Sequence, residues 1–410
     1  MRDDTPARPV HPFVWTVLIT PFGVLSGFVS VVLGFLATRH GLSVTDGASL
    51  IAVGMLPHTW KFLWAPVTDM TLSRRRWYLG SVLLVAAGIL GLSAIPLGKD
   101  TLPMLQALVF LTNLASTTLG MAVEGLMTHH TPPEGRGRAG GWFQAGNLGG
   151  GGVGGGAGLW LATNLPSPWM GGALLAALLV ACSAALLRVP DVLGDAGGKR
   201  VGEAVRDSVV DLKQLVTSRN GALAALICFL PIGTGAATGV MAQADVAAVW
   251  GATEVEVGTV NGVASGLIMA LGCLVGGEVC RRFAPRSVYA TMGALMALVA
   301  LAMSGAPLTP TSFVVGGLAY ALVTGFAYAA FTGLVLETIE GGGAATKYNI
   351  FAALSNTPIT YMGVYLASVF ATHGAAAMLQ VEAAAGLGGI ALFLVVAALV
   401  GRRPTAVSSA

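Results

Sequence analysis

Long apolar runs separated by short polar segments make up most of the chain from residue 13 onward. A helix needs about 20 apolar residues to cross the hydrocarbon core of a bilayer. Twelve runs suit that length, and they are called spans one to twelve below. The runs cover residues 13–37, 46–66, 77–97, 103–127, 139–163, 169–188, 221–243, 257–279, 287–306, 311–337, 348–371 and 377–400. The pattern predicts an all-α integral membrane protein with twelve transmembrane helices.

The polar segments between the spans are unequally charged. If the N-terminus is cytoplasmic, the segments on the opposite side hold only two basic residues, Arg39 and Lys99. The cytoplasmic segments then hold the rest, including the Arg74–Arg76 run. Basic residues are enriched in cytoplasmic loops, so both termini are expected in the cytoplasm. We expect a multi-pass protein of a bacterial-type inner membrane.

The longest polar segment, residues 189–220, divides the chain into two six-helix halves, 1–188 and 221–410. Within this linker, Val201–Val216 is expected to form an amphipathic helix on the membrane surface. The halves look related, since Asp69 and Glu278 end spans two and eight and are 209 residues apart. Asn147 and Asn356, in spans five and eleven, have the same separation. A parallel repeat of six helices predicts two pseudo-symmetric halves with a site between them.

Composition agrees with a membrane protein and excludes several other classes. Hydrophobic residues make up 55% of the chain and charged residues 10%, against roughly 25% charged in soluble domains. The net charge of +3 gives no reason to expect a nucleic-acid partner. We expect a monomer whose partners are membrane lipid, a small-molecule solute and protons.

Neither a metal site nor a cofactor is expected. The cysteines lack metal-ligand spacing and are interpreted as small packing residues. A membrane-embedded transferase would need a catalytic set, but His129, His130 and His373 are not grouped with carboxylates. The glycine run 149–156 lacks the lysine and hydroxyl residue of a phosphate loop. It is instead expected to let span five bend or approach a neighbour closely, and we do not expect an enzyme.

The stretch 56–69 in span two contains the most unusual polar pattern. Lys61 lies in an apolar run about 12 Å along a helix from Asp69. A charge in a membrane helix costs about 2.5–3.5 kcal/mol, so it usually has a partner or a function. Lys61 would face an anionic solute or a carboxylate in a central cavity, or else extend toward the lipid headgroups. Asp69 would form a gate with neighbouring arginines, or merely cap its helix.

We predict a gate at the cytoplasmic ends of spans two and eight. Its four residues are Asp69, Arg75, Glu278 and Arg282. Two further carboxylates are candidates for proton coupling, since a buried carboxylate can carry a proton. They are Glu124 in span four and Glu337 in span ten. The alternative is a salt bridge to a basic residue near the interface.

Amides and aromatic residues complete the expected solute site. Gln144, Asn147 and Asn356 lie two to three turns into their helices, where an amide needs a partner. A solute would supply that partner, and so would a hydrogen bond between helices. Trp60 and Tyr348 would stack on a ring of the solute or anchor the chain at the interface.

The segment Lys61-Phe62-Leu63-Trp64-Ala65-Pro66, followed by Asp69, resembles one branch of the major facilitator superfamily. This branch holds bacterial muropeptide permeases and acetyl-coenzyme A transporters. The stretch 346–348, with Ser355-Asn356-Thr357-Pro358 after it, is also similar to that branch. The chain departs from the general superfamily pattern, since Met70 rather than a basic residue follows Asp69. Glu124 matches the aspartate common in span four of the permeases only loosely, and their extra helices are missing here.

The resemblance implies an alternating-access secondary transporter driven by protons. It would import a moderately large polar or anionic solute that is muropeptide-like, siderophore-like or coenzyme A thioester-like. A proton-antiport exporter of drugs or metabolites is the alternative within transport. A membrane-embedded transferase is a third alternative.

Overall fold

The computed structural model describes residues 10–42, 44–192, 206, 209–210, 213, 217–339 and 344–401. Helices form nearly all of this part, and it contains no β-strand. The segments expected to be cytoplasmic after spans two, four and eight carry the basic residues Arg74–Arg76, Arg136, Arg138, Arg281 and Arg282. We call the end of the molecule that they mark the basic end. Most of the predicted amphipathic helix 201–216 lies outside the described residues.

The first six spans are built from the following elements. Span one is α1 (Phe13–Gly27), η1 (Phe28–Leu33) and α2 (Gly34–Arg39), and span two is α3 (Val44–Trp60), η2 (Lys61–Leu63) and α4 (Ala65–Met70). Spans three and four are α5 (Arg74–Ala94) and α6 (Leu102–His130). After η3 (Pro133–Gly135), span five is α7 (Arg136–Gly152), η4 (Val153–Ala157) and α8 (Gly158–Asn164), and span six is α9 (Pro168–Cys182) and η5 (Ser183–Arg188).

The last six spans are built from the elements that follow along the chain. Span seven is α11 (Arg219–Phe229) and α12 (Ala236–Met241), followed by α13 (Ala244–Ala247) and η6 (Ala248–Trp250). Span eight is α14 (Glu254–Asn261) and α15 (Val263–Arg282), and spans nine and ten are α16 (Pro285–Ser304) and α17 (Pro310–Thr338). Spans eleven and twelve form α18 (Ala344–Gly401), which bends sharply at Gly374. Gly374 has a φ of 82°, which is outside the helical region and readily adopted by glycine.

All twelve predicted spans thus coincide with helical segments. Eight continuous stretches among the described residues are long and apolar enough to cross a membrane, and the stretch 346–399 contains two spans. Spans two, five and seven are not among these stretches. Spans two and seven consist of shorter helices because each is interrupted, and span five is rich in glycine. In span seven, Pro231 follows α11, and Gly233 and Gly235 both have positive φ values, of 61° and 59°.

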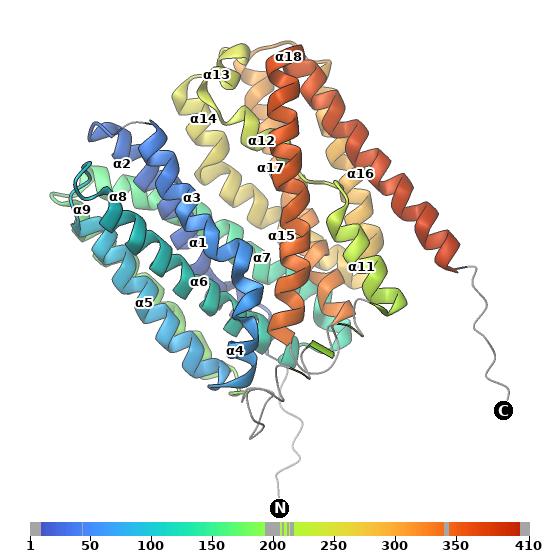
Figure 1. The fold of residues 1–410 in the computed structure, drawn as a ribbon, viewed down its shortest axis with the longest axis horizontal. Helices are drawn as coiled ribbons and strands as arrows, with labels where there is room; N and C mark the ends of the chain where they lie inside the picture. Colours follow the sequence, from blue (N-terminus) through green and yellow to red (C-terminus); the bar gives the residue numbers. More distant parts are fainter. Residues whose placement is uncertain are drawn as a thin grey trace, which may run out of the picture.

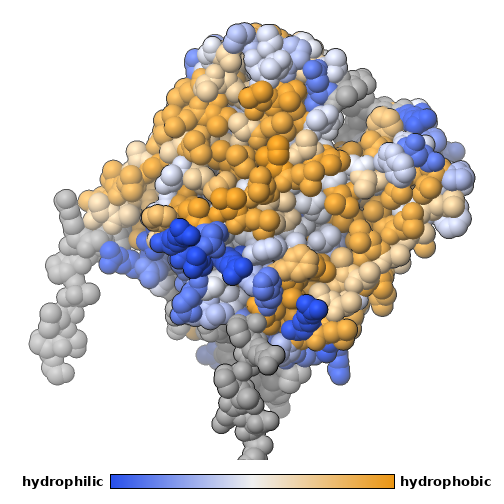
Figure 2. Space-filling view, turned by 180° about the vertical axis from the view of Figure 1, so that it is seen from behind, coloured by the Kyte–Doolittle hydropathy of each residue, from blue (hydrophilic) through white to orange (hydrophobic). Residues whose placement is uncertain are grey.

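The buried apolar side chains gather in separate clusters. The largest is drawn from residues 14–189, with Leu336 as its one contribution from the last six spans. Two others are drawn from residues 223–393. Figure 1 shows the blue to green helices of the first six spans on one side and the yellow to red helices of the last six on the other. Figure 2 shows a broad apolar surface across the middle of one face, with hydrophilic side chains toward its upper and lower margins.

Glycines allow span five to lie unusually close to two neighbours. A Cβ atom on Gly27 would lie 1.9 Å from the carbonyl oxygen of Gly151, so α1 and α7 touch through their backbones. On another face of α7, a Cβ on Gly141 would lie 2.5 Å from the carbonyl oxygen of Cys273 in α15. The glycine run therefore provides the close approach that its composition predicted.

Candidate functional site

Span two changes from an α-helix to a 3₁₀-helix at Lys61, five residues before Pro66. The α3 helix ends at Trp60, a single 3₁₀ turn follows, and α4 starts at Ala65 with Pro66 in its first turn. Proline has no N–H to donate and is tolerated in the first turn of a helix, so the chain restarts there. Lys61, in the 3₁₀ turn, is buried against α6.

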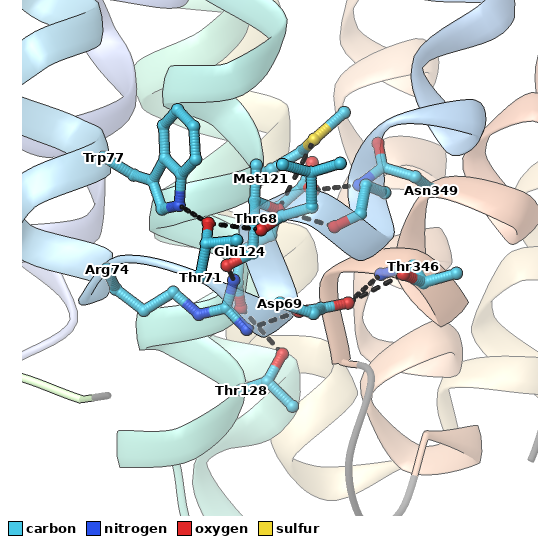
Figure 3. Close-up of polar contacts among 12 residues, drawn as sticks. Thr68, Asp69, Thr71, Arg74, Trp77, Met121, Glu124, Thr128, Thr346 and Asn349 are labelled. Carbon is cyan, nitrogen blue, oxygen red and sulfur yellow. Dashed lines mark hydrogen bonds and ion pairs between the residues drawn. The ribbon is translucent and has the colours of Figure 1, made fainter. Parts of the chain in front are cut away.

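Lys61 and Glu124 lie together in the interior. The Lys61 Nζ atom is 3.9 Å from Glu124 Oε1, and both residues are less than a tenth exposed. The second carboxylate oxygen, Oε2, accepts a 2.8 Å hydrogen bond from Nδ2 of Asn349. Asn349 belongs to α18, so Glu124 joins the first six spans to the last six (Figure 3). The charges that the sequence placed in two separate helices therefore form one buried group.

A second polar pair lies in the same two spans as Lys61 and Glu124. Nε2 of His58 is 3.1 Å from Oδ1 of Asn113. The His58 ring also packs edge-on against Phe22 of span one, with 5.2 Å between ring centroids. Spans two and four thus share two successive polar contacts, and the sequence analysis assigned no role to His58 or Asn113.

Asp69 occupies the junction between the two sets of spans at the basic end. Its Oδ2 atom accepts hydrogen bonds from the backbone N–H and the hydroxyl of Thr346, at 2.9 and 2.7 Å. Its Oδ1 atom pairs with the guanidinium of Arg74, which also donates a 2.5 Å hydrogen bond to the carbonyl of Thr68. All of these groups are buried (Figure 3). Asp69 is thus held by Arg74 at the start of span three and simultaneously binds the start of span eleven.

The other predicted gating residues lie elsewhere. The Arg75 side chain donates to the carbonyl of Leu186, and its backbone N–H donates to Asp191. Arg75 therefore binds the end of span six and the segment that follows it. Glu278 pairs with Arg281 at 2.5 Å and lies 3.8 Å from Arg282. These three side chains are substantially exposed and belong to a single helix, α15. Among the arginines at residues 74–76, Arg74 is the one that binds Asp69.

Gln144 makes a further contact between the two sets of spans. Its Nε2 atom donates a 2.8 Å hydrogen bond to the hydroxyl of Thr332 in α17. The Thr332 hydroxyl is also 3.2 Å from the hydroxyl of Tyr348. Asn147 donates to Oε1 of Gln144 at 3.0 Å, which orients that amide. The expected alternative for these amides, hydrogen bonding between helices, is therefore present for Gln144.

The remaining predicted residues have more open surroundings. Asn356 is exposed, and its amide makes no hydrogen bond to another residue of the described part. It follows Asn349 by two helical turns and so lies on the same face of α18. Glu337 is exposed in the last turn of α17, near the charges of Arg286 and Arg136. Trp60 ends α3, and its side chain lies outside what the structure describes.

Three site residues were missed by the sequence analysis. Asn349, Thr346 and Thr332 each complete a contact between the two sets of spans. A threonine hydroxyl can bond a carbonyl of its own helix, so Thr346 and Thr332 carry little signal in the sequence. Asn349 is an amide in a span and carried the same signal as Asn356. Asn349 and Thr346 lie beside Lys347 and Tyr348, and this proximity was the available indication in the sequence that they belong to the site.

Two bundles of six helices, joined through buried polar contacts between them, define the fold of a secondary transporter. Residues 16–357 match the sequence profile of the Major Facilitator Superfamily. The chain belongs to this superfamily, and it is a multi-pass membrane transporter. The predicted fold class and family resemblance are both confirmed.

Known proteins agree with this assignment. The anhydromuropeptide permease of Escherichia coli strain K12 is 26% identical over 352 residues, covering 82% of this chain and 70% of the permease. Among solved structures, the human organic anion transporter MFSD10 (TETRAN) has a TM-score of 0.72 at 16% identity, covering 95% of this chain and 100% of that chain. The Escherichia coli fucose:proton symporter FucP has a TM-score of 0.72 at 14% identity, covering 96% and 99%. The proton:xylose symporter XylE has a TM-score of 0.67 at 12% identity, covering 94% and 95%.

Proposed function

We propose that the chain imports a moderately large polar or anionic organic solute together with protons, by alternating access between its two six-helix halves. One observation carries the proposal. The buried carboxylate of Glu124 lies between a cation of its own half, Lys61, and an amide of the other half, Asn349. A change in the charge of Glu124 therefore acts on both halves at once.

Proton binding to Glu124 would remove the negative charge that faces Lys61. Lys61 would then be left as a buried cation, which strongly favours binding of an anionic group. Release of the proton restores the pair of Lys61 and Glu124 and expels the anion. This exchange couples one proton to one negative charge of the solute without requiring any other ionisable residue at the site.

The gate follows from the contacts at the basic end. Asp69 binds Thr346 across the halves, and Gln144 binds Thr332. These hydrogen bonds hold the halves together at that end, so it is the closed end in this structure. We propose that both contacts separate when the solute is delivered to that side, which we expect to be the cytoplasm.

A muropeptide-like solute is favoured over the siderophore-like and coenzyme A thioester-like classes. The support is the 26% identity to a permease whose name specifies anhydromuropeptides. Such a solute carries carboxylates for Lys61, and it carries amides and hydroxyls for Asn356 and the amides of span five. The exporter alternative uses the same residues in the reverse direction.

Uptake into proteoliposomes with an imposed proton gradient tests the proposal. Labelled anhydromuropeptides, siderophores and coenzyme A thioesters are supplied in parallel, at equal concentration. Gradient-driven accumulation of anhydromuropeptide supports import with protons. Accumulation that requires the gradient to be reversed supports the exporter, and absence of movement for every solute contradicts the proposed substrate classes.

A further inference from the structure

A second buried carboxylate, Glu382, lies in span twelve, one span after Asn349 and Asn356 of the proposed solute site. Its Oε2 atom accepts a 2.7 Å hydrogen bond from the hydroxyl of Tyr320 in α17. Its Oε1 atom accepts from the backbone N–H of Ala237 at 3.1 Å and lies 3.4 Å from the hydroxyl of Thr234. Glu382 is 5% exposed and Tyr320 is fully buried.

No lysine or arginine of the described chain forms an ion pair with Glu382. The elements around it carry few other ionisable groups. None lies in α12, α17 supplies Tyr320, and Tyr289 of α16 donates to the carbonyl of Ile232. The remaining ones are Arg219 and Cys228 of α11, Arg286 of α16, Tyr328 and Glu337 of α17, and Lys347, Tyr348, Tyr361, Tyr365 and His373 of α18 itself, all at other levels of their helices. A charge without a cation partner is costly in such surroundings, so protonation is the available means of neutralising it.

The hydrogen-bond partners of Glu382 suit both charge states. Ionised, the carboxylate accepts from all three donors. Protonated, it must donate once, and the hydroxyls of Tyr320 and Thr234 can each turn to accept. The N–H of Ala237 can only donate, and it is held less strongly by a neutral acid than by a carboxylate. Proton binding therefore weakens the contact between Glu382 and α12.

That contact lies at the interruption of span seven. Thr234 and Ala237 flank Gly235, whose positive φ starts the α12 segment. The next residue, Thr238, lines a cavity of about 130 Å³ together with Thr324 of α17 and Ser265 of α15. A change at Glu382 would therefore act next to Thr238, one of three hydroxyl residues in an otherwise mainly apolar cavity wall.

We propose that Glu382 is a second proton-binding site of this transporter and that its protonation loosens the start of α12 at the break in span seven. This inference rests on the proposed proton-coupled transport, since it assigns a second proton to that cycle. Glu124 would serve the first half and Glu382 the second.

Infrared difference spectroscopy between high and low pH, on the full chain in detergent, tests the site without requiring transport. The C=O stretch of buried protonated acids is expected in wild type with contributions from both Glu124 and Glu382. Glu124→Gln should keep the Glu382 contribution, and Glu382→Gln should lose that contribution alone. Glu256→Gln serves as the control, because Glu256 is not buried and glutamine preserves the capping box with Thr253. Tyr320→Phe should move the midpoint of the band to higher pH, because the ionised carboxylate loses a donor.

A Glu382→Gln spectrum that superimposes on that of wild type overturns the proposal. If Glu382→Gln does not purify as folded protein, Tyr320→Phe decides, and an unshifted midpoint overturns it. Failure of solute uptake in proteoliposomes would leave this spectrum unaffected. The second proton site and the proposed transport function can therefore fail separately.

Discussion

At the scale of single residues, the pair of Lys61 and Glu124 is the feature with the clearest chemical consequence. Each member neutralises the other in a buried setting, and removing one partner of such a pair typically costs about 3–5 kcal/mol. Burying two charges is costly, so the pair persists only where other contacts stabilise it or where the function depends on breaking it. The hydrogen bond from Asn349 to Glu124 compensates in part.

Replacing Glu124 with glutamine should separate solute movement from proton movement. The amide is similar in size and can still accept from Asn349, but it cannot ionise. Gradient-driven accumulation in proteoliposomes should fall to the equilibrium level, while exchange of labelled for unlabelled solute across the membrane should continue. Glu256→Gln should accumulate solute as wild type does. Undiminished accumulation in Glu124→Gln would remove this residue from coupling and direct attention to Glu337.

Replacing Lys61 with alanine should weaken binding of anionic solutes. A charged hydrogen bond is worth about 1.5–3 kcal/mol, so KM for an anionic solute should rise about 10- to 100-fold. Lys61→Arg should recover part of the loss, since it keeps the charge. The measurement is uptake against solute concentration for an anionic solute and its neutral amide. An equal loss for both solutes would contradict a role for Lys61 in charge recognition.

At the scale of elements, the interrupted spans two and seven lie where buried carboxylates accept hydrogen bonds. Span two changes from α to 3₁₀ geometry at Lys61, and α4 then presents Asp69 to the start of α18. Span seven breaks at Gly233 and Gly235 beside Glu382. An interruption frees backbone groups, and in a membrane such groups must find partners within the protein. The carboxylates of Asp69 and Glu382 each accept such an N–H, from Thr346 and Ala237.

Thr346→Val should weaken closure at the basic end. The substitution conserves shape and removes the 2.7 Å hydroxyl contact to Asp69, while the backbone contact remains. A loss of about 1 kcal/mol would raise the ratio of open to closed molecules about fivefold. Spin labels at Leu72 and Phe283, which are both exposed, would report this as a larger population of long distances by electron resonance.

The labelled protein would carry replacements of its four native cysteines, all of which are buried. Thr357→Val is the matched control, since its exposed hydroxyl contacts only the carbonyl of Ala353 in its own helix. An unchanged distance distribution in Thr346→Val would show that the hydroxyl does not contribute to closure.

At the scale of the whole molecule, the two halves contact each other through the backbone atoms of glycines as well as through polar side chains. Gly141 of α7 and Gly277 of α15 approach so closely that a Cβ on either would lie 2.7–2.8 Å from the Cα of the other. Without a hydrophobic driving force between membrane helices, association relies on such packing. The same close approach suits helices that must slide or tilt past one another.

Gly141→Ala should therefore destabilise the folded transporter. Overpacking of a tight contact costs about 1–3 kcal/mol, which should lower the Tm of the detergent-purified protein by several degrees. Gly80→Ala is the control, because a Cβ at this position of α5 meets no atom within 4 Å. Alanine is also the better helix former, so Gly80→Ala should keep or raise Tm. Equal Tm values for wild type and Gly141→Ala would contradict the tight packing of spans five and eight.

The sequence by itself determined the class and the spans. A membrane helix must satisfy its backbone internally and be apolar over a fixed length, so the twelve runs are visible without any tertiary contact. Proline and glycine act locally, so Pro231, Gly233 and Gly235 mark the interruption of span seven in the sequence itself. The charges of Lys61, Asp69 and Glu124 stood out because charges are rare in such runs.

Only the tertiary structure decided which of these groups meet. The repeat offset made Asp69 and Glu278 equivalent, yet Asp69 is buried against Thr346 and Glu278 is exposed with Arg281. Arg74 rather than Arg75 pairs with Asp69, and Asn349 rather than Asn356 reaches Glu124. Glu382 was not selected from the sequence because its partners come from two other spans, seven and ten. Partner choice depends on how each helix is rotated and tilted against its neighbours, and neither quantity is encoded in the spacing of residues along one helix.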